Sequence, residues 1–303
     1  MVSKIRVLSE NSINKIAAGE VIENPASVVK ELVENSLDAG ATDICVEIKG
    51  GGRQLIRVTD NGSGMSADDA LLCLERHATS KIRDVQDIHQ ITSLGFRGEA
   101  IPSIASISKF MLLTCLHEKS EEGTLVIVEG GNILKCAPAA CSPGTTIEVK
   151  SLFFNVPVRK KFQKSPAYDT TEILKMLSLL ALGHPDIKFQ LISNQEILLN
   201  APAPLSTSFD DQLGERINAV LGSEFFQGTC HAQGSKGDLE LQGYIGLPAC
   251  TRHNRTGQFL FINKRAVFSP LISYAVREGY GPSLSTNRHP LFVLHLNLSL
   301  IHI

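Results

Sequence analysis

The sequence predicts a mixed α+β fold arranged as two domains, and three observations support this. Residues 25–38 carry apolar side chains at helical spacing. Residues 44–49 alternate strictly between apolar and polar side chains, as a half-buried strand does. Residues 201–207 are rich in proline and serine and follow neither periodicity. A chain of 303 residues is long enough to form two hydrophobic cores on either side of that segment.

The first predicted helix combines start and stop signals with a polar stripe. Asn24, followed by proline, is a favourable N-cap, and Gly40 suits the C-terminal end. The apolar positions that should face a core are Val28, Val29, Leu32, Val33 and Leu37. Glu31, Asn35 and Asp38 recur at i, i+4 and i+7, so they share the opposite face. A stripe of this kind serves either solubility or a binding site, and the helix alone does not decide between them.

A hairpin and a glycine-rich turn follow this helix. Residues 44–49 and 55–59 read as paired strands joined by the flexible glycines 50–52. The second strand ends in Asp60, and Gly62 and Gly64 complete a D-x-G-x-G pattern. Glycines let a backbone approach a flat ligand closely, and a carboxylate can accept a hydrogen bond from an exocyclic amine. The same pattern is common in ordinary turns, so it indicates a ligand site only together with other motifs.

Two further segments combine hydroxyls, glycines and positive charge. Residues 76–81 end in Thr-Ser-Lys, and residues 94–100 read Leu-Gly-Phe-Arg-Gly-Glu-Ala before an apolar helix at 101–107. Glycines that precede a helix expose N–H groups, which together with the helix dipole bind anions. Taken alone, Lys81 and Arg97 have a second interpretation as solvated surface charges. The residues of the predicted phosphate site are Thr79, Ser80, Lys81, Gly95, Phe96, Arg97 and Gly98.

Three other features keep a structural interpretation. Asp38 either complements its helix by bonding the backbone or serves the site. His77 reads as a structural hydrogen-bonding residue because no carboxylate partner is evident. Glycines 50–52 read as a hairpin turn, because the chain contains no G-x-x-x-x-G-K-[ST] phosphate loop.

The rest of the chain alternates between helices and strands. A strand at 147–149 follows Gly144-Thr145-Thr146, and a helix at 166–182 precedes strands around Phe189 and Ile197. Beyond the proline-rich segment we expect helices at 210–221 and 270–278 and strands at 239–245, 259–263 and 291–298. The predicted domains are therefore 1–201 and 208–303.

Composition narrows the class of protein. No apolar run reaches membrane-spanning length and no signal-peptide pattern opens the chain. The seven cysteines are scattered without a C-x-x-C pair, which predicts neither a disulfide framework nor a zinc site and favours a reducing cytoplasm. A net charge of −2 gives no global attraction to nucleic acid, so any such contact needs a local basic patch. The basic candidates are Arg252, Arg255, Lys264, Arg265 and Arg277, with a mixed charged surface as the alternative.

The order of these motifs resembles the GHKL ATPases, which include gyrase-type topoisomerases, heat-shock chaperones and sensor histidine kinases. The amino-acid sequences of four segments are most similar to the MutL family of DNA mismatch repair proteins: residues 16–22, 25–32, 76–81 and 94–100. The resemblance extends from about Ile13 to about Leu298. It implies a Bergerat-type ATPase sandwich followed by a small βαβ domain that is incomplete here.

The resemblance also implies a role for each matched residue, with ATP and Mg²⁺ as cofactors. Glu31 would activate the attacking water, Asn35 would coordinate Mg²⁺, and Asp60 would hold the adenine amino group. Thr146 would assist Asp60, and Gly62 and Gly64 would give the ring room. The remaining nucleotide-binding residues implied are Asp38, Thr79, Ser80, Lys81, Gly95, Phe96, Arg97 and Gly98.

At the level of the whole protein, the resemblance implies a matchmaker in DNA mismatch repair. ATP binding would drive homodimerisation and clamping of single- or double-stranded DNA without sequence specificity, beside a MutS-type mismatch recognition protein. We expect a cytoplasmic bacterial protein associated with the nucleoid, with no membrane contact. The basic residues 252, 255, 264, 265 and 277 would contact DNA.

Two alternatives remain open. Residues 299–303 do not resemble the family, whose last strand here continues into a lysine that reaches the γ-phosphate, so we expect a truncated chain. Without that lysine the chain would be a nucleotide- and DNA-binding fragment with negligible turnover. The second alternative is another GHKL ATPase or kinase.

Overall fold

The computed structural model describes residues 22–81, 94–95, 98–117, 122–285 and 287–298. It confirms the α+β class. By internal contacts the chain divides into a first unit, Met1–Met176 with Gln190–Leu198, and a second unit, Leu177–Phe189 with Leu199–Ile303. Domain limits at 201 and 208 stay a prediction. The residues after 298, where a truncated end is expected, lie outside the described residues.

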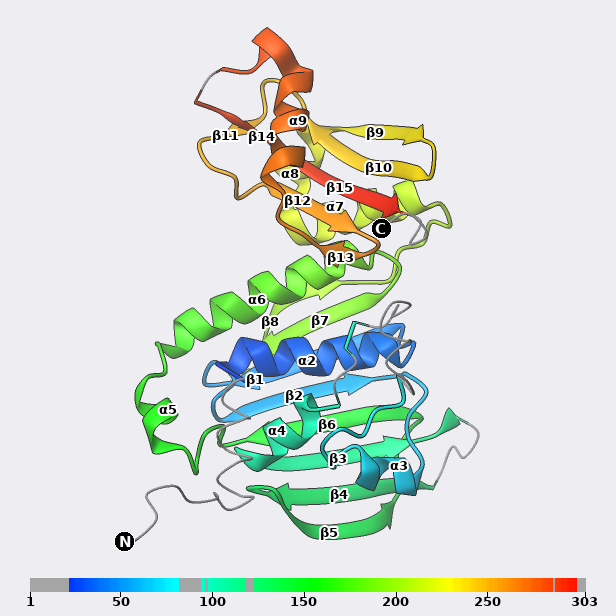
Figure 1. The fold of residues 1–303 in the computed structure, drawn as a ribbon, viewed down its shortest axis with the longest axis vertical. Helices are drawn as coiled ribbons and strands as arrows, with labels where there is room; N and C mark the ends of the chain where they lie inside the picture. The colour runs from blue at the N-terminus through cyan, green and yellow to red at the C-terminus, as the bar shows by residue number, and fades with distance from the viewer. Residues whose placement is uncertain (1–21, 82–93, 96–97, 118–121, 286, 299–303) are drawn as a thin grey trace, which may run out of the picture. The chain divides into compact units, whose positions relative to one another are not determined.

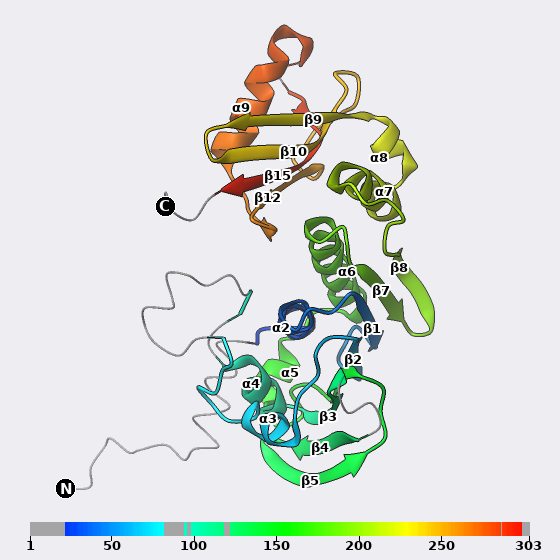
Figure 2. The ribbon, with the colours of Figure 1, turned by 90° about the vertical axis from the view of Figure 1, so that its right-hand side faces the viewer.

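The first unit is built on an eight-stranded sheet with helices on one face (Figures 1 and 2). The strand order is β5-β4-β3-β6-β2-β1-β7-β8. The strands are β1 (Asp43–Lys49), β2 (Leu55–Asp60), β3 (Lys109–Cys115), β4 (Gly123–Glu129), β5 (Asn132–Ala139), β6 (Gly144–Lys150), β7 (Lys188–Ser193) and β8 (Glu196–Ala201). The helices are α2 (Pro25–Asp38), α3 (Ala67–Leu72), α4 (Ala100–Ser106) and α5 (Pro157–Lys161), and α6 (Pro166–Gly183) begins in this unit and ends in the second.

Helix α2 forms where its signals predict it. The Asn24 side chain accepts a hydrogen bond from the Ser27 amide at 2.9 Å, which satisfies one of the free N–H groups of the first turn. Gly40 ends the helix with φ 72°, a conformation that costs glycine little. Val28, Val29, Leu32 and Val33 are buried as predicted, whereas Leu37 is only half-buried. The apolar stripe packs on β1 and β2.

The strict alternation of β1 places its two sets of side chains on opposite faces of the sheet. Ile44, Val46 and Ile48 are fully buried. On the other face Glu47 meets Arg57 of β2, whose Nη1 lies 2.5 Å from the Glu47 carboxylate. Arg57 Nη2 also lies 2.6 Å from Glu148 of β6. These ion pairs join three adjacent strands and reinforce their register.

Glu148 is the most buried member of this charged cluster. Burial raises the pKa of its carboxyl, but hydrogen bonds from Lys150 and Arg57 lower it by more, so the net pKa is below the usual value. Lys150 Nζ lies 2.5 Å from Glu148 Oε2. The carboxylate is therefore stabilised in its charged form.

The second unit contains a five-stranded sheet of order β13-β12-β15-β10-β9 and a two-stranded ribbon, β11-β14. The strands are β9 (Thr229–Lys236), β10 (Leu239–Gly246), β11 (Thr251–Arg252), β12 (Gln258–Ile262), β13 (Arg265–Ala266), β14 (His289–Pro290) and β15 (Phe292–Leu298). The helices are α7 (Phe209–Leu221), α8 (Ser223–Gln227), α9 (Pro270–Tyr280) and the short 3₁₀ helix η3 (Gly281–Ser283). Strands β12 and β15 are parallel, with α9 in the connection between them.

Alternate residues of β12 and β15 supply two cores, one on each face of this sheet. Phe261 and Val293 pack in a cluster with Leu213 and Ile217 of α7. Leu260 and Leu294 belong to the opposite cluster, which Ile272 and Val276 of α9 cover. Both faces of the sheet are thus shielded by a helix, which explains the nearly continuous apolar run of β15.

Arg216 of α7 is buried and donates hydrogen bonds to four backbone carbonyls. Its Nη1 donates to the carbonyl of Ala201 at 2.9 Å. Its Nη2 donates to the carbonyls of Pro185, Ile187 and Pro202 at 2.9, 2.5 and 3.0 Å. Burial lowers the pKa of Arg216 to about 10, which still leaves it charged at neutral pH. In the part of the chain that the structure describes, no helix is long and apolar enough to cross a membrane.

Candidate active site

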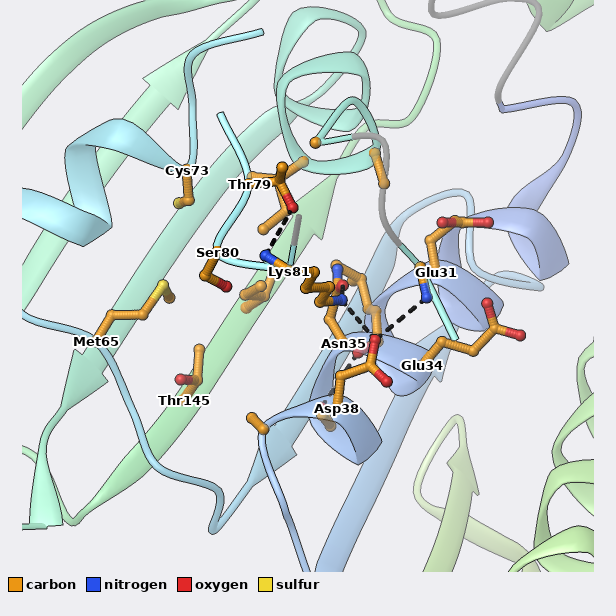
Figure 3. Close-up of a pocket in the computed structure, with 18 of the residues that line it drawn as sticks. Glu31, Glu34, Asn35, Asp38, Met65, Cys73, Thr79, Ser80, Lys81 and Thr145 are labelled. Carbon is orange, nitrogen blue, oxygen red and sulfur yellow. Dashed lines mark hydrogen bonds and ion pairs between the residues drawn. The ribbon is translucent and has the colours of Figure 1, made fainter. Parts of the chain in front are cut away.

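The first unit contains a large cavity beside helix α2. Its volume is about 1010 Å³, within the usual range for ligand-binding pockets or slightly above it. The lining comes from one face of α2, the end of β2, helix α3, residues 77–81, residues 94–95 and 98–102, and strand β6. Figure 3 shows these side chains converging on one space.

One face of α2 supplies the acidic and amide groups. Glu31, Asn35 and Asp38 all line the cavity, so the i, i+4, i+7 stripe points into it. Glu34 lines it as well, which the sequence reasoning missed. Lys30 Nζ lies 3.1 Å from the Glu34 carboxylate and 3.7 Å from that of Glu31. Burial raises the pKa of Glu34, and the charges of Glu31 and Asp38 act in the same direction against the opposing effect of Lys30.

Asp60 ends strand β2 at the floor of the cavity. Its Oδ2 accepts a hydrogen bond from the Ser36 hydroxyl at 2.7 Å, and its Oδ1 accepts one from the Gly62 amide at 2.9 Å. Burial raises the pKa of Asp60, against the lowering effect of these hydrogen bonds and of one from the Thr145 backbone. The carboxylate is thereby fixed in orientation, and Ser36, a residue the sequence reasoning missed, is the side chain that fixes it.

Lys81, Asp38 and Asn35 form a compact network in the same cavity. Lys81 Nζ lies 2.5 Å from Asp38 Oδ2 and 3.1 Å from Asn35 Oδ1. The Asp38 carboxylate also accepts hydrogen bonds from the amides of Leu94 and Gly95 at 2.8 and 3.2 Å. Asp38 therefore does accept hydrogen bonds from backbone amides, but these amides belong to a distant segment and not to its own helix. Asp38 holds the ammonium and the amides together, which are the donors that a phosphate would need.

Two glycines of the predicted motifs are required by packing against other backbone segments. Gly64 has φ 69°, and a Cβ there would lie 1.9 Å from the Cys115 carbonyl oxygen. Gly98 has φ 61°, and a Cβ there would lie 2.3 Å from the Ala78 carbonyl oxygen. Close approach to the protein's own backbone is therefore sufficient reason for glycine at both positions, whether or not a ligand approaches as well. Thr79 and Ser80 line the cavity beside them.

The predicted residue Thr146 is not in the lining of this cavity, and its neighbour Thr145 is. Thr145 lines the cavity, whereas the Thr146 hydroxyl donates to Thr59 at 3.2 Å and is absent from the lining. Adjacent residues of a strand point to opposite faces, and the pairing of Asp60 with Thr145 fixes which of the two faces the site. Thr145 lies directly opposite Asp60 on the neighbouring strand, so the two side chains share one face of the sheet. This strand pairing is the signal that would have identified Thr145.

The structure also supplies the carboxylate partner of His77 that the sequence did not reveal. His77 Nδ1 lies 3.2 Å from Glu99 Oε1, and Glu99 lines the cavity. The histidine side chain itself is 78% exposed, which fits a structural hydrogen bond at the rim of the cavity. Phe96 and Arg97 lie outside the described residues.

The basic residues of the second unit fall into two groups. Arg252 and Arg255 precede strand β12, and Arg277 lies on α9; Arg255 and Arg277 line one small pocket. Lys264 and Arg265 lie at the other end of β12, at its turn into β13, and Lys264 Nζ is 3.9 Å from the Asp186 carboxylate. The five predicted DNA contacts therefore do not form one patch.

A metal ion in the first cavity would need oxygen atoms of a bound nucleotide in addition to its protein ligands. Within the described ranges, no three His, Cys, Asp or Glu side chains are arranged to hold a metal ion by themselves. The Asn35 amide oxygen together with the α2 carboxylates is an all-oxygen donor set of the kind that Mg²⁺ prefers. Mg²⁺ commonly takes one or two protein ligands and completes its shell with phosphates and water, so the cavity fits a nucleotide-bound magnesium ion.

Comparisons with known proteins agree with this geometry. Residues 22–129 match the family profile described as "Histidine kinase-, DNA gyrase B-, and HSP90-like ATPase", and residues 217–303 match "DNA mismatch repair protein, C-terminal domain". The chain is 46% identical over 300 residues to the DNA mismatch repair protein MutL of Syntrophotalea carbinolica, covering 98% of this chain and 46% of that protein. It is 45% identical over 295 residues to MutL of Chlamydia abortus, covering 97% and 49%. The chain thus spans just under half the length of these curated relatives.

Solved structures extend the comparison to the fold. The MutL ATPase domain of Aquifex aeolicus complexed with ADP superposes with a TM-score of 0.66 at 31% identity, covering 92% of this chain and 93% of that domain. The N-terminal domain of a DNA repair protein superposes with a TM-score of 0.76 at 26% identity, covering 95% and 87%. The sequence and the fold lead to the same conclusion: the chain belongs to the MutL family of DNA mismatch repair proteins.

Proposed function

We propose that the first unit binds ATP with Mg²⁺ and hydrolyses it slowly to ADP and phosphate. The observation that carries this proposal is the convergence of Glu31, Asn35, Asp60 and Lys81 on one cavity of about 1010 Å³. A similar domain, 31% identical, was solved in complex with ADP. The cavity contains an oriented carboxylate, which suits a base, and a cation with backbone amides, which suits phosphates.

Asp60 recognises the base in this proposal. Its carboxylate, oriented by Ser36 and Gly62, accepts a hydrogen bond from an exocyclic amine such as that of adenine. Thr145 replaces Thr146 as the neighbouring hydroxyl, since it lines the same cavity and its backbone donates to Asp60. A base that presents a carbonyl at this position would place two acceptors face to face, so the site discriminates against guanine.

The phosphates bind at the Lys81 side. Lys81 and the amides of Leu94 and Gly95 exchange the Asp38 carboxylate for phosphate oxygens, and Thr79 and Ser80 add hydroxyl donors. Asn35 contributes an oxygen to Mg²⁺, which would neutralise charge on the phosphates. The proposal extends to Gly98 as part of this segment and to Phe96 and Arg97, which the structure does not describe.

Glu31 is the proposed general base. Its carboxylate lines the cavity one helical turn from Asn35 and can accept a proton from a water molecule directed at the terminal phosphate. Lys30 Nζ lies 3.7 Å from that carboxylate. Glu34 also lines the cavity, which makes it the residue to test against Glu31.

At the level of the whole protein, we infer a matchmaker in DNA mismatch repair. ATP binding would promote dimerisation of the chain and clamping of single- or double-stranded DNA without sequence specificity, with a MutS-type protein as partner. Arg252, Arg255, Lys264, Arg265 and Arg277 are the proposed DNA contacts of the second unit. Such a protein would act in the bacterial cytoplasm on nucleoid DNA.

The test measures ATP turnover and nucleotide binding separately in Glu31→Ala and in its matched control Glu34→Ala. We expect Glu31→Ala to lose turnover by about 10²-fold or more and to keep nucleotide affinity, because a general base acts on the transition state. Glu34→Ala should keep turnover within a few fold. Loss of turnover in Glu34→Ala alone would transfer the role of base to Glu34. Tight binding without turnover in the wild-type protein would make the chain a nucleotide-binding module.

A further inference from the structure

The second unit contains a small pocket surrounded by positive charge. It has a volume of about 60 Å³, which leaves room for a group the size of a phosphate rather than a whole nucleotide. Its lining is Arg255, Gln258, Ser273, Tyr274, Arg277, His289 and Pro290. None of these residues, all of which the structure describes, is acidic. The pocket therefore suits an anion.

The fold brings this lining together from three segments. Arg255 lies in the loop before β12, Tyr274 and Arg277 lie one turn apart on α9, and His289 begins β14. Helix α9 packs against β14, as Figure 1 shows. Arg252 is paired directly with His289 across the β11–β14 ribbon, so its side chain projects from the same face of that ribbon. Two arginines, Arg255 and Arg277, thus line the pocket with His289, and Arg252 is its partner across the ribbon.

The positive charge around His289 affects the pKa of its imidazole. Burial lowers the pKa of His289, and the positive charges of Arg255 and Arg277 lower it further. Both guanidinium groups line the same pocket as the imidazole. An anion in the pocket would relieve the mutual repulsion of these cations.

An exposed aromatic ring stands beside the pocket. Tyr274 is 60% exposed although it lies in the lining, because Ile272 and Val276 occupy the core-facing side of α9. An exposed ring next to a phosphate-sized basic pocket matches the way proteins hold single-stranded nucleic acid, in which bases stack on aromatic side chains while cations hold the backbone. The faces of bases inside a duplex are covered by their neighbours and cannot stack on such a ring.

We propose that Arg255, Arg277 and Tyr274 form a binding site for single-stranded DNA, with a phosphate in the pocket and the adjacent base stacked on the tyrosine. This inference rests on the DNA-binding part of the proposed function and deepens it. Lys264 and Arg265, at the far end of β12, contact backbone phosphates without distinguishing single strands from duplex.

The test measures the binding of a labelled oligothymidine and of a labelled duplex to the full chain by fluorescence anisotropy at several salt concentrations. We expect Tyr274→Ala to weaken single-strand binding about tenfold and to leave duplex binding within twofold. Tyr274→Phe, which keeps the ring, should bind like the wild-type protein. Arg277→Ala should reduce the steepness of the salt dependence for the single strand by about 0.7, which corresponds to one lost phosphate contact.

The matched control is Tyr168→Ala. Tyr168 is also a surface tyrosine beside a cation, with Lys164 Nζ 4.0 Å from the ring centroid, but it belongs to the first unit and does not line this pocket. Equal losses for single strand and duplex in Tyr274→Ala, or unchanged binding of both, would overturn the proposal; the second result would leave a surface for a protein partner. Circular dichroism, measured on the same samples, reports whether each variant folds. A wild-type chain that turns over ATP but binds neither DNA would instead remove the DNA-binding function itself.

Discussion

Ser36 shows how one hydroxyl controls the chemistry of a neighbouring carboxylate. Its hydrogen bond to Asp60 at 2.7 Å is the single side-chain contribution that opposes the rise in the pKa of Asp60 caused by burial. We expect Ser36→Ala to weaken nucleotide binding about fivefold, because one buried hydrogen bond contributes about 1 kcal/mol. Isothermal titration with ADP measures this change.

The pH dependence of nucleotide affinity is a second measurement on Ser36→Ala. The pKa of Asp60 is raised, so the charged acceptor is lost as pH falls at a value above the ordinary 3.8, and Ser36→Ala should move this loss to higher pH still. Ser63→Ala is the control, because Ser63 lines the same cavity and its hydroxyl contacts only the Gly64 carbonyl, at 3.4 Å, among the described residues. If nucleotide affinity fell at the same pH in the wild-type protein and in Ser36→Ala, the proposed effect of Ser36 on the Asp60 carboxylate would be contradicted.

Residue spacing predicted the polar face of α2 but not the partners of its members. Glu31, Asn35 and Asp38 could be placed on one face because helical geometry is local. The contacts of Asp38 with Lys81, Leu94 and Gly95 depend on a chain reversal that no local pattern encodes. The same holds for Glu99 beside His77, which are 22 positions apart in the sequence.

At the scale of elements, strands β1 and β2, which have a buried face, were predictable, and the mostly exposed strands β5 and β9 were not. The alternation of β1 and β2 reflects a buried face and an exposed face, so it is visible in the sequence. Strands β5 and β9 lie at sheet edges and are mostly exposed, so they carry no alternation and take their register from β4 and β10. Register also decided between Thr145 and Thr146, since a shift of one residue exchanges the faces.

The charged cluster on the sheet gives a prediction at this scale. The pKa of Glu148 is lowered in the folded state, so its contribution to stability is present above the unfolded value of 4.5 and is lost as pH falls through the folded value. Glu148→Gln should reduce the free energy of unfolding at pH 7 by about 1–2 kcal/mol. The difference from wild type should shrink on acidification below pH 4.5.

Urea denaturation followed by circular dichroism measures this, because the chain has no tryptophan for fluorescence. Glu129→Gln serves as the control: its ion pair with Lys109 on the same sheet is 3.2 Å long but exposed, so we expect a change of about 0.5 kcal/mol or less. A loss in Glu148→Gln that stays constant with pH would assign the effect to packing instead of charge.

At the scale of the molecule, the chain passes three times between the two units, at 176/177, 189/190 and 198/199. Arg216 binds the carbonyls of Pro185 and Ile187 before the β7–β8 hairpin, that of Ala201 at its last residue and that of Pro202 after it. Two short segments of the second unit lead into and out of the hairpin. The Arg216 side chain holds both of them. Replacing it leaves several buried carbonyls without a donor, each of which costs about 1–3 kcal/mol.

We therefore expect Arg216→Met to destabilise the second unit by about 3–5 kcal/mol while the first unit keeps its nucleotide site. Hydrogen exchange followed by mass spectrometry resolves the two units: peptides from α7 and β12 should exchange faster, and those from α2 and β1 should stay protected. Arg159→Met is the matched control, since Arg159 donates at 3.0 Å to a carbonyl in the first unit, that of Ile22. Uniformly faster exchange in both units of Arg216→Met would show that they unfold as one cooperative body, and the nucleotide site would then depend on α7.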